Sequence, residues 1–228
     1  MYKLLILFCL FTAFDASAQT NNLLATENQT TGSAINISVS APDNRNGDDF
    51  FSEADITEKK GDLFNALTLF GKAAFEYNST HQFSNYGSAL LRMSNVHMML
   101  NNFAEAEQVV LNVALKNYSR THNIHGEMNS YRQLAKIYLA SDKLTQALWF
   151  STQQGILARQ LKSDNSYMES MLGIATVKIR KKQYTLANKD LNKAELYAKT
   201  TNNTRFRSQL TYARNQIASH SNSKKLLF

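Results

Sequence analysis

The side chains able to bind a metal ion are few and lie far apart in this sequence of 228 residues. The histidines are His81, His97, His122, His125 and His220. Only His122 and His125 are near enough in sequence to share a zinc ion, and no cysteine or carboxylate cluster stands beside them. We therefore expect no metal site.

Motifs for catalysis are also missing. The sequence has no glycine-rich phosphate loop, no Gly-x-Ser-x-Gly turn and no isolated pair of carboxylates on an apolar helix face. Its single cysteine, Cys9, lies in an apolar run at the N-terminus. We predict a protein that is not an enzyme and that binds no cofactor.

Charge is distributed unevenly along the chain. Basic and acidic residues number 6 and 11 over residues 19–118, 4 and 2 over 119–158, and 14 and 4 over 159–228. The densest basic run, Lys178 to Lys182, could contact an acidic partner. It is also typical of a helix C-terminus, where cations favour the negative end of the helix dipole, and we favour this second interpretation.

The N-terminus has the pattern of a secretory signal peptide, with Lys3, an apolar run from Leu4 to Phe14, and the cleavage motif Ala16-Ser17-Ala18. The run of 11 residues is shorter than the roughly 20 that a membrane-spanning helix needs. We expect a mature chain that begins at Gln19, is periplasmic or secreted, and has no transmembrane segment. An exported basic chain rarely meets nucleic acid, so we expect it to attract acidic proteins, anionic glycans or membrane surfaces instead.

Four pairs of small residues recur along the chain with the same internal spacing of 12. The pairs are Ala54 with Ala66, Ser94 with Ala106, Ala135 with Ala147, and Ala175 with Ala187. Their second members follow one another at steps of 40, 41 and 40 residues. Such self-similarity at a fixed period indicates a repeat array.

Each repeat has the pattern of two helices joined by a tight polar turn. A bulky residue four positions before the first small residue lies on the same helix face, as Phe50 does before Ala54. The polar segments 60–62, 101–102, 141–143 and 181–183 separate the two helices. The small residues allow close approach, so the sequence predicts packed antiparallel helix pairs.

These units resemble tetratricopeptide repeats, whose pattern is an aromatic residue, Leu-Gly and Tyr in the first helix, then Ala, Phe and Pro in the second. The third unit matches best, with Tyr131, Leu134-Ala135, Tyr138 and Ala147. His97 takes the place of the tyrosine in the second unit, so we expect it to pack inside the fold.

The sequence also departs from the family pattern. The period exceeds the usual 34 by about six residues, which we place at the end of the second helix and in the loop after it. The closing proline is missing from every unit, and Ser151 and Gln154 replace apolar residues in the second helix of the third unit.

The resemblance implies an all-α, right-handed α-solenoid of antiparallel helix pairs with a C-terminal capping helix. We expect a signal peptide over residues 1–18, a flexible polar arm over 19–46, four repeats over 47–203, the capping helix over 204–219 and a tail over 220–228.

First helices line a concave groove in tetratricopeptide arrays. Carried onto this sequence, the resemblance implies a groove face formed by Leu91, Asn95, Met98, Arg132, Lys136, Leu139, Leu172, Thr176 and Ile179. The lysine and asparagine pair with which some members clamp acidic tails is incomplete, since Asn95 is kept but the first unit offers Phe51 and Asp55. Arg132 and Lys136 repel each other unless a partner or a neighbouring carboxylate relieves them, so they are either an anchor for an acidic segment or a solvated face.

We therefore expect a scaffold that binds a peptide or protein segment in this groove. The alternative is a sensor or regulatory module of a bacterial signalling system, similar to the repeat domains that precede histidine kinases. Five Asn-x-Ser/Thr sequons, which matter only if the source glycosylates its exported proteins, begin at Asn28, Asn36, Asn78, Asn117 and Asn202.

Overall fold

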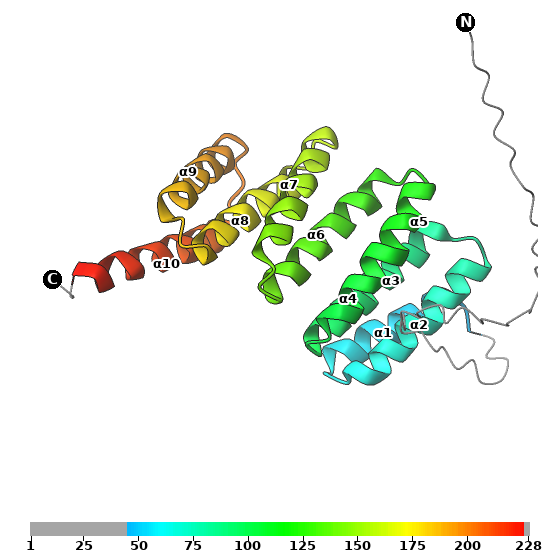
Figure 1. Ribbon diagram of the computed structural model, residues 1–228. Helices are drawn as coiled ribbons and strands as arrows, with labels where there is room; N and C mark the ends of the chain where they lie inside the picture. The colour runs from blue at the N-terminus through cyan, green and yellow to red at the C-terminus, as the bar shows by residue number, and fades with distance from the viewer. Residues whose placement is uncertain (1–44, 226–228) are drawn as a thin grey trace, which may run out of the picture. The chain divides into compact units, whose positions relative to one another are not determined.

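Helices make up all the regular secondary structure in residues 45–225, the part of the chain that this computed structural model describes (Figure 1). The expected signal peptide and residues 19–44 of the expected arm lie outside this part. The helices in order are α1 (Gly47–Lys59), α2 (Leu63–Ser79), α3 (Phe83–Met99), α4 (Phe103–Gln108), η1 (Val109–Ala114), α5 (Leu115–Arg120), α6 (Ile124–Ala140), α7 (Leu144–Gln160), α8 (Asp164–Arg180), α9 (Tyr184–Thr200) and α10 (Arg207–Lys225).

Each helix packs mainly against the helices that precede and follow it in sequence, which confirms an all-α solenoid of antiparallel pairs (Figure 1). The run α4–η1–α5 acts as one second helix, so the four pairs are α1 with α2, α3 with this run, α6 with α7, and α8 with α9. The first helices α3, α6 and α8 also contact one another, and α10 packs against α8. None of the described helices is long and apolar enough to cross a membrane.

One turn conformation recurs between successive helices of the array, with the run α4–η1–α5 counted as one helix. A residue with positive φ stands at 61, 81, 101, 122, 142, 162, 182 and 202. At His81, the amide of Gln82 donates to the carbonyl of Tyr77 at 2.8 Å, and the amide of His81 donates to that of Asn78 at 3.2 Å. This is a Schellman motif, which satisfies carbonyls that the end of a helix leaves free.

The recurrence of this turn corrects the expected position of the additional residues. Turns within units and turns between units are equally short, and α3, α6, α7, α8 and α9 all have 17 residues. The long period therefore comes from two long helices per unit and not from a longer loop after the second helix.

The single step of 41 residues has its own cause. The second helix of the second unit contains the π-helical segment Val109–Ala114, and the whole run from Phe103 to Arg120 is one residue longer than its counterparts in the other units. A π-bulge absorbs one inserted residue without ending the helix. Tyr118 thereby takes the place in its unit that Tyr77 takes in the first.

Both tyrosines pack against a glycine of their own first helix. A Cβ atom built on Gly47 would lie 2.7 Å from the Tyr77 ring, and one built on Gly87 would lie 2.3 Å from the Tyr118 ring. The equivalent positions of the third and fourth units hold the reverse combination, Met128 with Ala158 and Met168 with Ala198. Large and small residues have exchanged places, so the interior volume is conserved along the array.

The packing of α7 on α8 explains why Ser151 and Gln154 depart from the family pattern. Both side chains are buried, and Nε2 of Gln154 donates to the carbonyl of Ser166 at 3.2 Å. A Cβ atom on Gly155 would lie 2.3 Å from Oγ of Ser170. Small and polar residues let these two helices approach closely where other junctions use apolar side chains.

The last helix covers the open end of the fourth unit. Phe206, Leu210, Ala213 and Ile217 are buried in one cluster with residues of α8 and α9. Arg214 fixes this helix to α9 by donating to Glu195, Asn188 and Asn192. The helix begins at Arg207 and continues to Lys225, so it starts later and extends further than the expected 204–219.

Candidate functional site

Five of the nine expected groove residues line one cavity of about 340 Å³. Arg132, Lys136 and Leu139 reach it from α6, and Leu172 and Thr176 reach it from α8. All five project from first helices. The structure therefore brings together the groove residues of the third and fourth units.

Part of the remaining lining comes from α10, which the sequence did not indicate as a wall of the groove. Gln209, Tyr212 and Gln216 of α10 complete the cavity, beside Glu169 of α8. Because α10 packs against α8, it occupies the place that the first helix of a further unit would take. The spacing of the buried residues 206, 210, 213 and 217 leaves 209, 212 and 216 on an adjacent stripe, and this was the available signal.

The two cations of the cavity have different surroundings. Nη1 of Arg132 lies 3.4 Å from Oε2 of Glu169, so a carboxylate from the next unit relieves this charge. No carboxylate in residues 45–219 lies within ion-pair distance of Lys136. Burial, and then repulsion by Arg132, lower the pKa of Lys136, while Glu169 opposes this effect. Lys136 is therefore the cation whose charge is least compensated.

The expected groove residues of the second unit belong to a different environment. Nδ2 of Asn95 donates to Oε1 of Glu58 at 3.0 Å, and Nε2 of Gln133 lies 3.3 Å from the sulfur of Met98. Leu91 packs partly buried between two core clusters. These side chains join neighbouring first helices to one another, so they are not part of the cavity.

Ile179 does not belong to a groove surface. It is 8% exposed and packs in the core cluster of α8, α9 and α10. The sequence placed it on the open face because α10 was not known to cover that end of α8.

Asp55, the acidic residue at the clamp position of the first unit, also forms an ion pair within the fold. Arg92 of α3 forms ion pairs with Asp55, at 2.5 Å, and with Glu58, both from α1. The guanidinium group also lies 5.0 Å from the centroid of the Phe70 ring. This cluster connects the first two units and holds the pKa of Asp55 below its ordinary value, chiefly through the hydrogen bond from Lys59.

The basic run at the end of α8 has intramolecular partners. Nζ of Lys178 lies 2.5 Å from Oδ2 of Asp190, and a guanidinium nitrogen of Arg180 lies 2.7 Å from Oδ1 of Asp142. Lys181 is the C-cap of the helix and Lys182 has the positive φ of the turn. These positions agree with the interpretation of the run as a helix terminus.

The histidines form no metal site in the described residues, where no group of three potential ligands occurs. Nδ1 of His97 is buried without a hydrogen-bond partner, and burial lowers the pKa of this imidazole while Glu105 opposes the shift. This agrees with the expected packing role of His97.

Asn117 of the fourth sequon is buried, with Nδ2 donating to the carbonyl of Phe83 at 2.7 Å, so the folded chain does not present it to a glycosylating enzyme.

Comparison with known proteins identifies the type of fold but not the function. No protein-family model and no curated protein sequence matches this chain. A solved structure of BtubC (BKLC) from P. vanneervenii has a TM-score of 0.62 and 12% identity, and the match covers 70% of this chain but only 65% of BtubC, less than two thirds of that protein. The apo form of RapI has a TM-score of 0.66 and 10% identity, with 79% of this chain and 70% of RapI covered.

A third neighbour shows the repeat most directly. The structure of a putative kinesin light chain of Podosopora anserina, described as having nearly identical TPR-like repeats, has a TM-score of 0.62 and 14% identity, with 79% of this chain and 90% of that chain covered. Identities this low indicate fold alone. Together with the four helix pairs, these likenesses show that the chain has a tetratricopeptide-like helical repeat fold.

Proposed function

We propose that this protein is a non-enzymatic scaffold that binds a segment of another protein across α6, α8 and α10. The observation that supports this most is the convergence of side chains from these three helices on one open cavity. A solenoid stacks its units without needing such a hollow, and extended repeat surfaces are generally used for binding.

The charge of the cavity favours an acidic segment. Arg132 is already relieved by Glu169, whereas Lys136 has no carboxylate at ion-pair distance in residues 45–219. A carboxylate from a bound segment would compensate this charge and would also lie near Arg132. Tyr212, which is 66% exposed, adds an aromatic surface for the same segment.

The test is a charge reversal at Lys136. We expect Lys136→Glu to leave the helical circular dichroism spectrum and the melting temperature nearly unchanged, because it breaks no ion pair, and to weaken capture of partners from the native envelope identified by mass spectrometry. Lys116→Glu is the matched control, since it makes the same change on an exposed position of α5. Arg132→Glu is less suitable because it would also remove the ion pair of Arg132 with Glu169.

Equal capture by the wild type and Lys136→Glu would show that the cavity is not the binding surface. Binding of an acidic segment should also weaken as salt rises, since exposed charges are screened beyond roughly 10 Å at 0.1 M ionic strength.

Export of the protein is part of this proposal. It rests on the sequence of residues 1–18, and it predicts that the intact mass of the native protein corresponds to a chain beginning at Gln19. Recovery of a chain that still carries Met1 from the envelope would contradict it. A sensor or regulatory module of a signalling system is the second candidate, and capture of a kinase or receptor would favour it.

A further inference from the structure

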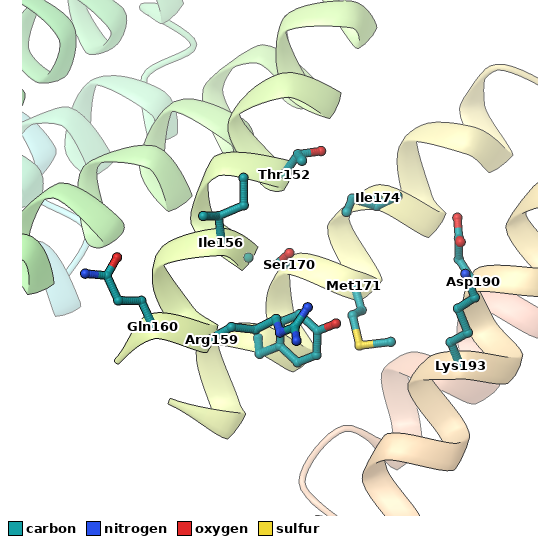
Figure 2. A pocket seen from close by; sticks show the side chains of 11 residues that line it. Thr152, Ile156, Arg159, Gln160, Ser170, Met171, Ile174, Asp190 and Lys193 are labelled. Atoms are coloured by element: carbon teal, nitrogen blue, oxygen red, sulfur yellow. The ribbon is translucent and has the colours of Figure 1, made fainter. Parts of the chain in front are cut away.

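A second cavity, of about 630 Å³, lies on the face of the second helices (Figure 2). It is located between α7 and α9, and residues of α8 form its floor. Ile156 and Arg159 line it from α7, and Asp190 and Lys193 line it from α9. Met171 and Ile174 of α8 lie between these two walls (Figure 2). This cavity shares no lining residue with the cavity on the face of the first helices, so it is a separate surface.

Comparison with the other units shows why this cavity is open. Three positions after the recurring alanine of the second helix, the first three units have Leu69, Val109 and Phe150, each at most 8% exposed, and the fourth has Asp190. In the third unit the Phe150 ring stacks on Tyr138 at 5.2 Å between centroids. The same two positions of the fourth unit hold the ion pair of Lys178 with Asp190. The apolar side chain that covers the first helix in the other three units is therefore replaced in the fourth unit by Asp190, whose carboxylate pairs with a lysine.

The replacement leaves apolar surface of α8 uncovered. Leu90 and Met93, the equivalents of Met171 and Ile174 in the second unit, are each 2% exposed and share a core cluster with Val109. Met171 and Ile174 are only partly buried. Ile156, on the wall of the cavity, is 55% exposed. An apolar side chain from outside would therefore find a site of the kind that the second unit fills by itself.

The charges at the rim define the partner further. Asp190 is neutralised by Lys178, whereas Arg159 and Lys193 have no carboxylate within ion-pair distance in the part of the chain whose side chains are described. The charge that remains uncompensated at the rim is therefore positive. A ligand with carboxylates on both sides of its apolar residues would match it.

The apolar surface continues along α7 with helical spacing. Trp149 is 52% exposed and precedes Ile156 by seven residues, which is two helical turns or about 10 Å. A helical ligand presents its own apolar residues at the same interval. We propose that the cavity between α7 and α9 binds an amphipathic acidic helix of another protein, with an apolar residue over Met171 and Ile174 and carboxylates beside Arg159 and Lys193.

A defined peptide tests this proposal on the full chain. The probe is a fluorescein-labelled 18-residue helix of Leu, Glu and Ala whose leucines are spaced three and four residues apart, and its counterpart has Lys in place of Glu. Binding is measured by fluorescence anisotropy. The variant that closes the cavity is Asp190→Leu combined with Lys178→Gln, because leucine stands at this position in the first unit and the second change removes the unpaired lysine.

We expect the acidic probe to bind the wild type and to lose at least about tenfold in affinity on the closed variant, which corresponds to about 1.4 kcal/mol. The basic probe should bind at least tenfold more weakly than the acidic one, and Arg159→Ala with Lys193→Ala should reduce this preference. Lys116→Glu is the control, since it reverses an exposed charge that lines neither cavity and should leave the affinity unchanged, and Lys136→Glu reports whether the probe occupies the cavity of the first helices.

Four results would overturn the proposal: no saturable binding of the acidic probe, equal binding by the closed variant, equal binding of the basic probe, or loss of binding in Lys136→Glu alone. The last would place the probe in the cavity of the first helices. Sedimentation of the wild type as a dimer that the closed variant dissociates would instead assign the cavity to a second copy of this chain.

Discussion

The exchange of large and small residues between Gly87 and Tyr118 offers a quantitative test of the packing. The structure has no space for a side chain at Gly87, because its Cβ would lie 2.3 Å from the Tyr118 ring. Met128 with Ala158 and Met168 with Ala198 fill the same positions in the next two units. We therefore expect Gly87→Met and Tyr118→Ala to be harmful singly and to compensate each other when combined.

The magnitudes follow from the two kinds of damage. Tyr118→Ala removes a buried aromatic ring and should lower the free energy of unfolding by about 3–5 kcal/mol. Gly87→Met overpacks the same site and should cost about 1–3 kcal/mol. Independent effects would add to a loss of about 4–8 kcal/mol, and we expect the double variant to lose at least about 2 kcal/mol less than that sum, because residues in contact couple.

The assay is urea unfolding followed by circular dichroism of the wild type, both single variants and the double variant. A third change, Gly126→Ser, should recover further stability in the double variant, because Gly126 also contacts the Tyr118 ring and the equivalent residue beside Ala158 is Ser166. If Gly87→Met does not fold, folding of the double variant measures the rescue. Free energies that add to within about 0.5 kcal/mol would refute the complementarity.

Two further predictions concern the turns and the buried histidine. Lys182→Gly should raise the free energy of unfolding by about 1 kcal/mol, because Lys182 has a φ of 59° that glycine adopts without strain. Lys181→Gly is the control, since Lys181 has a φ of −74° and its replacement by glycine should lower the free energy of unfolding. A lower melting temperature for Lys182→Gly than for the wild type would contradict the prediction. The folded state holds the pKa of His97 below its ordinary value of 6.5, so the unfolded chain binds more protons and the wild type should lose stability as the pH falls from 7.5 to 5.5. His97→Gln should lose less over that interval in urea titrations, and identical losses would exclude His97 as the cause.

The candidate site shows where prediction from sequence succeeded and where it ended. The helical period placed Arg132, Lys136 and Leu139 on one face of α6, and the structure finds them in one cavity. Glu169 and the side chains of α10 were not foreseen, because they meet α6 through packing between segments far apart in the sequence. For Arg132, the sequence left a partner and a neighbouring carboxylate as alternatives, and the structure supplies the carboxylate.

The sequence alone determined the helix pairs, their number over residues 47–203 and the position of the turns within units. This was possible because the spacing of apolar and small residues decides which face of a helix can be buried, and that is a local property. It also showed that one step of the repeat is longer by one residue, although it did not show that a π-bulge holds the extra residue inside a helix.

Only the tertiary structure decided which surfaces remain open. Asn95 and Asp55 look available in the sequence but are occupied by Glu58 and Arg92, and Ile179 is covered by α10. Asp190 looks like an ordinary surface acid, yet its place in the array opens a cavity because the apolar residue of the other units is missing. The exposure of a side chain depends on what neighbouring units place against it, and that information is spread over residues far apart in the chain.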